Sequence, residues 1–206
     1  MGNTGESALY RIESTFSTPW GYTKKYAVTM RAMIRPLNHD DVSSYRTLRL
    51  RSLESDPGSF HIKLADAKEW SLERFEKECC GEDGPVFGYL GFFDGTSLLG
   101  YISLSRHMPF KDPEGACIYN LYVLPEHRKR GIARELIEAV LKRAQSEPHL
   151  QMIYLFVHKV NTVARTLYEK YGFLEDRGEH FYYYQLPSDE VLLSRKSRID
   201  IDHKTL

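Results

Sequence analysis

Residues 116–133, with the sequence ACIYNLYVLPEHRKRGIA, constrain the fold of this chain more than any other stretch. Their first half is almost continuously apolar, which favours a strand at the centre of a sheet with both faces covered. Their second half is a basic turn that contains Gly131, and apolar residues recur at helical spacing directly after it. A strand that leads through such a turn into a helix presents unpaired amides and the positive end of the helix dipole. This stretch therefore predicts an anion site.

Length and charge limit the classes of protein to consider. The chain has 206 residues, with 28 Lys and Arg against 28 Asp and Glu, so we expect one domain and neither nucleic acid nor an anionic membrane as partner. The three cysteines show no zinc-ligand spacing and no even disulfide framework, so no metal site is expected and the thiols should be reduced. No segment resembles a membrane span or a secretory signal, which predicts a soluble cytoplasmic protein.

Hydrophobic periodicity predicts an α/β fold with a mixed central sheet flanked by helices. The expected elements, in chain order, are a strand at 32–36, a helix from Asp40 or Asp41 to Asp56, a helix at 69–80, strands at 86–93, 98–104 and 116–123, a helix from 132 to Pro148, a strand at 152–157, a helix at 161–171 and a strand at 180–186.

The two ends of the chain lack such patterns. Residues 1–30 are polar and rich in Ser, Thr and Gly, and we interpret them as an N-terminal arm that could pack on the domain or on a second copy of the chain. A homodimer is therefore one candidate assembly. Residues 31–187 are predicted to form the domain, and residues 188–206 a polar C-terminal tail that begins after Pro187.

Two motifs within this framework point to a family. The run RKRGIA at 128–133 follows Val123 and Pro125, and the segment NTVARTLYEKYGF occupies 161–173. Either motif alone is weak, but with this spacing and this order of elements they resemble the GCN5-related N-acetyltransferase (GNAT) family. The resemblance extends over residues 31–187 in element order, with residue-level detail between 116 and 173. It implies a GNAT-like acyl-CoA N-acyltransferase fold.

The resemblance also implies a site for acetyl-CoA as co-substrate. Amides around the turn would hold the pyrophosphate, a glycine would let the backbone approach it, and the central strand would pair with the pantetheine arm. The implied cofactor-binding residues are Leu121, Tyr122, Val123, Lys129, Arg130, Gly131, Ile132, Ala133, Arg134 and Asn161. Asn161 also suits a plain helix cap, and the basic run also suits a solvated loop or a nucleic-acid contact.

Tyr168 is the predicted catalytic residue. A phenol with a pKa of about 10 can give a proton to a leaving thiolate, and the resemblance places Tyr168 beside the sulfur. A purely buried aromatic role is the alternative, and it is the one expected for Tyr171. The backbone of the central strand would polarise the acetyl carbonyl.

The general base stays open. Relatives carry a Glu at the positions of Phe156 or Cys117, and neither residue can replace it. Glu114, His107 and His158 are nearby in sequence without a stronger claim. Cys117 is interpreted as a buried thiol and not as a nucleophile, which favours direct attack by the acceptor.

The leading hypothesis is an N-acetyltransferase that transfers an acetyl group from acetyl-CoA to a primary amine of a small molecule or peptide. The alternative is a catalytically silent acyl-CoA-binding regulatory module, because the cofactor cradle is recognisable and the base is not. The acceptor is expected near the first two helices, the loop 106–115 and Tyr182–Tyr184, but no motif identifies it.

Overall fold

The computed structural model describes residues 7–17, 23–81, 87–108, 111–177 and 189–197, with side chains from Ala32 onward. The strands in these residues are β1 (Ser7–Ser17), β2 (Thr23–Pro36), β3 (Gly88–Asp94), β4 (Ser97–Ser105), β5 (Gly115–Val123), β6 (Met152–His158), β7 (Leu174–Glu175) and β8 (Glu190–Lys196). The helices are α1 (Val42–Ser55), α2 (Leu64–Lys68), α3 (Leu72–Cys80), α4 (Ile132–Gln145) and α5 (Thr162–Lys170), with 3-10 turns η1 (His39–Asp41), η2 (Pro57–Ser59) and η3 (Pro125–His127).

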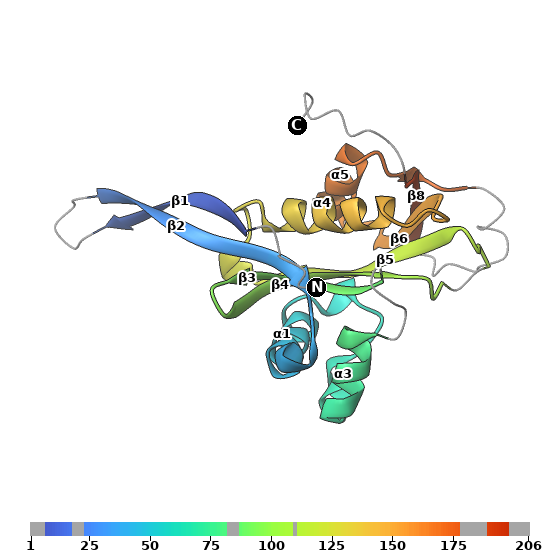
Figure 1. Cartoon of the computed structure of the whole chain (residues 1–206), viewed down its shortest axis with the longest axis horizontal. Coiled ribbons are helices and arrows are strands. Elements are labelled where there is room, and N and C mark those ends of the chain that lie inside the picture. The colour runs from blue at the N-terminus through green and yellow to red at the C-terminus, as the bar shows by residue number, and fades with distance from the viewer. Residues whose placement is uncertain (1–6, 18–22, 82–86, 109–110, 178–188, 198–206) are drawn as a thin grey trace.

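The described strands form one mixed sheet in the order β1-β2-β3-β4-β5-β6-β8-β7. Helices α1 and α3 cover one face of this sheet, and α4 and α5 cover the other (Figure 1). Among the described strands, β5 and β6 are the one parallel pair. The α/β fold class and the helix-flanked mixed sheet predicted from periodicity are confirmed.

The core follows the predicted periods. Leu136, Ile137 and Val140 of α4 are fully buried against the sheet, and on the opposite face Tyr45 and Leu48 of α1 are buried as well. Each of these helices packs one apolar face against the sheet. The sheet between them therefore has to be apolar on both faces, as the continuous apolar run of β5 indicated.

The second expected helix is shorter than predicted. Ser71 caps the backbone amide of Arg74, so α3 begins at Leu72 and not at Glu69, and the preceding segment forms the separate helix α2. Because the sequence pattern predicts no element between Asp56 and Glu69, α2 is a helix that the sequence analysis misses. The serine cap, and not the apolar pattern, decides where α3 starts.

The N-terminal arm is a correction to the sequence prediction. Residues 7–17 and 23–36 form an antiparallel ladder that runs from Ser17↔Thr23 to Ser7↔Met33, and β2 continues into the sheet by pairing Ala32–Pro36 with β3. Most of this hairpin is held by backbone pairing between its own strands. Such pairing imposes no apolar period, which explains why no strand is predicted before Ala32.

The C-terminal tail is a second correction. β8 lies inside the sheet between β6 and β7, and its Val191, Leu192 and Leu193 are buried. The flanking charges suggested a solvated tail, but Arg195 is buried and donates a hydrogen bond to the carbonyl oxygen of Tyr171 at 2.6 Å. The predicted strand at 180–186, and with it Tyr182–Tyr184, lies outside the described residues.

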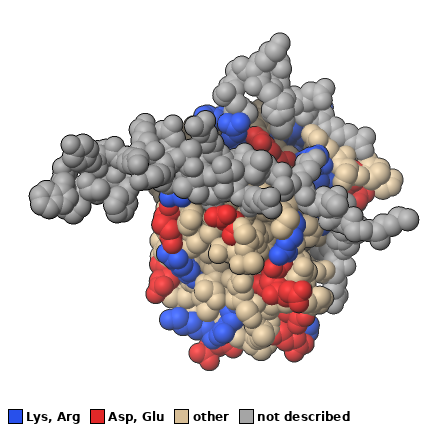
Figure 2. Space-filling view, turned by 60° about the vertical axis from the view of Figure 1, so that its left-hand side comes forward, with Lys and Arg blue, Asp and Glu red and all other residues tan. Residues whose placement is uncertain are grey.

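The described surface matches the balanced composition. Figure 2 shows a face on which Lys and Arg side chains are interspersed with Asp and Glu. Among the described residues, no helix combines the length and the apolar character needed to cross a membrane.

Candidate active site

The turn between β5 and α4 presents backbone amides at the start of a long helix. Lys129 and Gly131 both have left-handed backbone conformations, with φ of 60° and 87°. Among the described residues, the atom nearest to a Cβ built at 131 is Glu135 Oε1 at 3.7 Å, so the backbone conformation and not crowding requires glycine there. No described side chain caps the first turn of α4, which leaves its amides and the helix dipole facing the turn. These groups fit a bound pyrophosphate.

Arg128 anchors this turn to the opposite side of the sheet. Its guanidinium donates two hydrogen bonds to the Asp56 carboxylate, at 2.6 and 3.3 Å, and a third to the carbonyl oxygen of Val123 at 2.9 Å. Partial burial alone would raise the pKa of the Asp56 carboxyl, but hydrogen bonds from Arg128 and Ser55 outweigh it and hold that pKa below its usual range. Arg128 is therefore a structural clamp although it is exposed, as Lys129 and Arg130 are.

The two central strands part beside this turn. Pairing between β5 and β6 ends at Ile118↔Leu155, although β5 continues to Val123 and β6 to His158. A β-bulge accompanies the parting: Tyr101 pairs with Tyr122 and Ser103 with Tyr119, so β5 carries an extra residue there. The β5 backbone beyond Ile118 has no paired β6 residue within the described chain. An extended ligand can therefore pair with residues 121–123 as a further strand would.

Asn120, inside the bulge, is held from behind by a buried polar network. Its backbone is left-handed, with φ of 55°, and its side-chain amide donates to Tyr89 Oη at 2.5 Å. The Tyr89 hydroxyl donates to Glu78 Oε1 at 3.3 Å, and Glu78 also pairs with the fully buried Arg49 at 3.3 Å. Burial raises the pKa of the Tyr89 phenol, so this group stays protonated as a hydrogen-bond donor.

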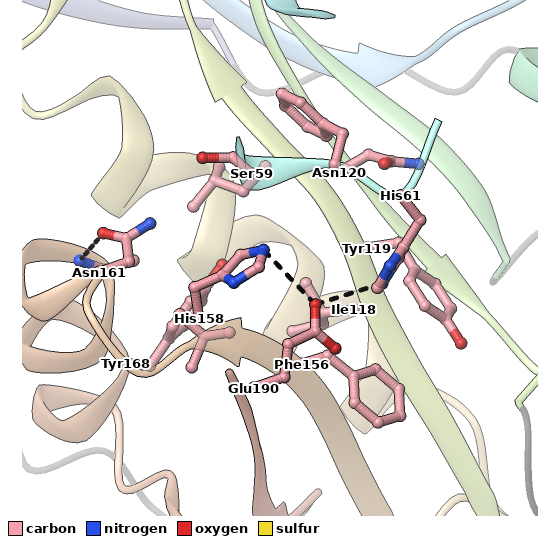
Figure 3. A pocket seen from close by; sticks show the side chains of 14 residues that line it. Ser59, His61, Ile118, Tyr119, Asn120, Phe156, His158, Asn161, Tyr168 and Glu190 are labelled. Atoms are coloured by element: carbon pink, nitrogen blue, oxygen red, sulfur yellow. Dashed lines mark hydrogen bonds and ion pairs between the residues drawn. The ribbon is translucent and has the colours of Figure 1, made fainter. Parts of the chain in front are cut away.

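A cavity of about 130 Å³ opens where the strands part (Figure 3). It is lined by Ser59, Phe60, His61, Ile118, Tyr119, Asn120, Leu121, Phe156, Val157, His158, Asn161, Ala164, Tyr168 and Glu190. The structure therefore brings Leu121, Asn161 and Tyr168 together at one cavity, while residues 129–134 lie at the neighbouring turn.

Asn161 acts as a helix cap. Its side-chain oxygen accepts a hydrogen bond from the backbone amide of Ala164 at 3.1 Å, and the residue also lines the cavity. The cap role is thus confirmed, and the cofactor contact stays a prediction. The two roles are compatible, because the amide group can donate while its oxygen accepts.

Tyr168 lies on the inner face of α5 with 7% of its surface exposed, and it lines the cavity. Burial, with a smaller contribution from Cys117, raises the pKa of its phenol above the ordinary value. A neutral phenol is the form that can donate a proton. Tyr171, in contrast, donates to Glu138 at 2.9 Å and is absent from the residues that line the cavity.

The positions where relatives carry a base do not supply one here. Cys117 is fully buried, and burial raises the pKa of its thiol, which excludes an activated thiolate. Phe156 lines the cavity and stacks against Tyr119. Glu114 and His107 are exposed and do not line the cavity.

Three titratable residues line the cavity that the sequence analysis did not assign to the site. It did not name His61 or Glu190, and it named His158 only as a neighbour in sequence. His61 follows η2, His158 ends β6 and Glu190 begins β8, so they come from three separate segments. Glu190 is paired directly opposite His158 in the sheet. The apolar run Val191–Leu193 was the available signal for a strand here, but the neighbouring charges hid it, and no local motif marks His61.

Comparison with known families gives one clear match. A family model described as the Acetyltransferase (GNAT) family matches residues 47–173. The chain is 27% identical over 150 residues to an aminoglycoside N(6')-acetyltransferase type 1 of Salmonella typhimurium, which covers 72% of this chain and 96% of the relative. It is 26% identical over 178 residues to a mycothiol acetyltransferase of Thermobispora bispora, which covers 84% of this chain. The chain spans only 56% of that relative's length.

Solved structures show the same fold. The PaiA N-acetyltransferase from Thermoplasma acidophilum, solved in complex with coenzyme A, matches with a TM-score of 0.59 and 21% identity over 81% of this chain and 99% of the other. At this level of identity the likeness concerns the fold alone, and it confirms the fold predicted from the two motifs.

Proposed function

The chain belongs to the acetyltransferase (GNAT) family, and from this premise we propose that it transfers the acetyl group of acetyl-CoA to a primary amine of a small molecule or peptide. The two curated relatives are named for acetylation of an aminoglycoside nitrogen and of mycothiol, which supports a small acceptor. The observation that carries the proposal is the cavity between the parted ends of β5 and β6, where Tyr168 lies beside an open strand edge.

The donor half of the site is built from backbone groups. Acetyl-CoA supplies an acetyl group activated as a thioester. The amides of residues 129–134 would hold its pyrophosphate, and the open edge of residues 121–123 would hold its pantetheine arm, with Asn161 as a further contact. A backbone amide beside the Asn120 bulge would polarise the acetyl carbonyl.

Tyr168 completes the reaction on the donor side. Its neutral phenol gives a proton to the sulfur as the carbon–sulfur bond breaks. Direct attack by the acceptor nitrogen requires no covalent enzyme intermediate, consistent with the inert Cys117 thiol.

A panel of primary amines, incubated with the protein and acetyl-CoA and monitored by release of free thiol, tests this proposal. We expect acetylated product from at least one alkyl amine. If acetyl-CoA binds tightly and none of the amines is acetylated, the protein is instead a silent acyl-CoA-binding module.

We also place this activity in the cytoplasm, where the three free cysteines would stay reduced. A homodimer is part of the proposal, because β1 is an edge strand of the sheet and offers backbone groups for pairing. Sedimentation velocity tests the assembly.

A further inference from the structure

We propose that Glu190, His158 and His61 form the acceptor site, in which the Glu190 carboxylate binds the acceptor as an ammonium ion and His158 removes its proton. This inference rests on the proposed function, since it assigns the acceptor half of the same reaction. It concerns residues that neither motif of the donor half includes.

The geometry brings the three side chains to one point. Nε2 of His158 and Nε2 of His61 each lie 3.7 Å from the same oxygen, Oε1 of Glu190. Figure 3 shows the two imidazoles converging on this carboxylate at the cavity that Tyr168 also lines. At 3.7 Å neither contact is a hydrogen bond, so the carboxylate oxygen keeps its acceptor capacity for a ligand.

Charge and burial indicate what that ligand is. The Glu190 side chain is 5% exposed, and its Oε2 is buried without a hydrogen-bond partner among the residues that the structure describes. The described residues that line the cavity include neither Lys nor Arg. With both imidazoles neutral, a buried carboxylate without a cation is costly. An alkylammonium ion would supply both the missing charge and three hydrogen-bond donors.

A metal ion fits this cluster less well. Within the described chain, no group of three His, Cys, Asp or Glu side chains has the arrangement needed to hold one. An organic cation is the ligand class that the geometry favours.

His158 is better placed than His61 to act as the base. Its Nδ1 lies 3.2 Å from Asp189 Oδ2, so the Nδ1 proton is directed to that carboxylate and the lone pair of Nε2 faces the cavity. Its side chain is 27% exposed, whereas that of His61 is 61% exposed. His158 also lies two residues after Phe156 on β6, so both side chains project from the same face of the strand.

The acceptor nitrogen has to lose two protons as the ammonium ion becomes an amide. The bound ammonium gives one proton to His158, which passes it to solvent. The freed lone pair forms the carbon–nitrogen bond, the carbon–sulfur bond breaks with its electron pair on sulfur, and Tyr168 protonates the sulfur. The second proton leaves the nitrogen as the amide forms and restores the Tyr168 phenol, so one proton is released overall.

The cluster also selects among acceptors. An aliphatic amine is cationic at neutral pH and would be attracted by Glu190 and Asp189. An aromatic amine is neutral, and a carboxylate next to the amine would be repelled by both acidic groups. We therefore expect alkyl amines without a neighbouring acid as the preferred class.

Binding of a simple probe tests this site without any turnover. n-Butylammonium is titrated into the CoA-saturated protein while the imidazole resonances of His158 and His61 are followed by NMR, with n-butanol as the neutral isostere. We expect n-butylammonium alone to shift both resonances, and Glu190→Gln to weaken its binding by roughly tenfold or more. Glu114→Gln removes an exposed carboxylate outside the cavity and should change nothing. Absence of a shift, or equal binding by Glu190→Gln, would overturn the proposal.

Kinetics test the base separately. With an alkyl amine that the protein acetylates, His158→Asn should lower kcat by roughly 100-fold and remove the acidic limb of the pH–rate profile. The groups that face this imidazole are Glu190, Asp189 and His61. Unchanged acetyl-CoA affinity in His158→Asn and in Glu190→Gln shows that both variants are folded. An unchanged pH profile in His158→Asn would overturn its role as base.

The two proposals fail in different ways. If no amine is acetylated, the proposed function fails, and butylammonium binding still decides whether Glu190 forms a cation site. If amines are acetylated and Glu190→Gln is as active as the original chain, the acceptor assignment fails and the function stands.

Discussion

The proposed donor and acceptor halves of this site are constructed in opposite ways. The proposed donor half uses backbone groups from one nearly continuous stretch, residues 121–134, with Tyr168 from α5 and Asn161 from its N-cap. The acceptor half uses side chains from three segments that are far apart in the sequence: His61, His158 and Glu190.

This difference determines what each half tolerates. A backbone site depends on φ angles, so it is sensitive to the glycine at 131 and indifferent to many other side chains. A side-chain site depends on residue identity, so a change of one carboxylate to an amide should disable it without altering the fold. The predictions below place substitutions in the proposed donor half and in the structure that supports it, where backbone geometry should matter most.

Gly131→Glu should have the largest effect. It places a β-carbon on a residue with φ of 87° and a negative group at the pyrophosphate cradle, so acetyl-CoA affinity should fall by roughly 1000-fold or more. Isothermal titration calorimetry measures the loss. Gly131→Asn is the matched control, because asparagine tolerates the left-handed region and carries no charge, and it should lose much less. Full affinity in a folded Gly131→Glu variant would remove the cradle from this turn.

Glu78→Gln should have the next largest effect, because Glu78 supports the bulge at Asn120 from behind. It leaves the buried Arg49 without its counter-charge and loosens Tyr89 behind Asn120, so the free energy of unfolding should fall by about 3 kcal/mol. Urea denaturation measures this. Glu73→Gln, on the exposed side of the same helix, should have little effect. Equal stability of the two variants would mean that the ion pair does not support the bulge.

Tyr168→Phe should separate binding from chemistry. Loss of the phenol should lower kcat by roughly 100-fold while acetyl-CoA affinity stays unchanged, because the cradle is elsewhere. Single-turnover kinetics and calorimetry give the two quantities. Tyr171→Phe removes a phenol of similar burial that bonds Glu138 away from the cavity, and it should leave kcat unaffected. Normal turnover by Tyr168→Phe would exclude it as the acid.

Arg128→Gln should have the smallest effect. The Arg128–Asp56 pair is partly exposed, so the loss of stability should be about 1 kcal/mol or less. Because the folded pKa of Asp56 is lowered, the pair contributes above the ordinary carboxyl pKa of about 4 and loses its contribution as the pH falls through the lowered value. A double-mutant cycle with Asp56→Asn, repeated as the pH is lowered from 7, measures this. A coupling that does not begin to decline below the ordinary carboxyl pKa of about 4 would contradict the assignment.

The same contrast explains how far the sequence could lead. The family prediction from residues 128–133 and 161–173 is confirmed. It could be made from sequence because a backbone cradle needs a glycine and small residues at fixed spacing within one stretch of the chain. The acceptor half has no spacing to read, since Glu190 meets His158 only through the pairing of β8 with β6.

The predictions of an N-terminal arm and a C-terminal tail were wrong for a related reason. Neither the β1–β2 ladder nor β8 has a long apolar period in its sequence. The ladder is held by its own backbone pairing, and β8 carries only a three-residue apolar run between charged residues that turn out to be buried. Long-range strand pairing decides both, and local patterns do not encode it.

The position of β8 also orders the events of synthesis. It is the last of the described elements to be made, yet it fills the space between β6 and β7. A nascent chain emerging from the ribosome therefore exposes the cradle and Tyr168 before Glu190 exists. A messenger RNA truncated before the Glu190 codon would yield a polypeptide that still carries both family motifs and lacks the carboxylate proposed to bind the acceptor.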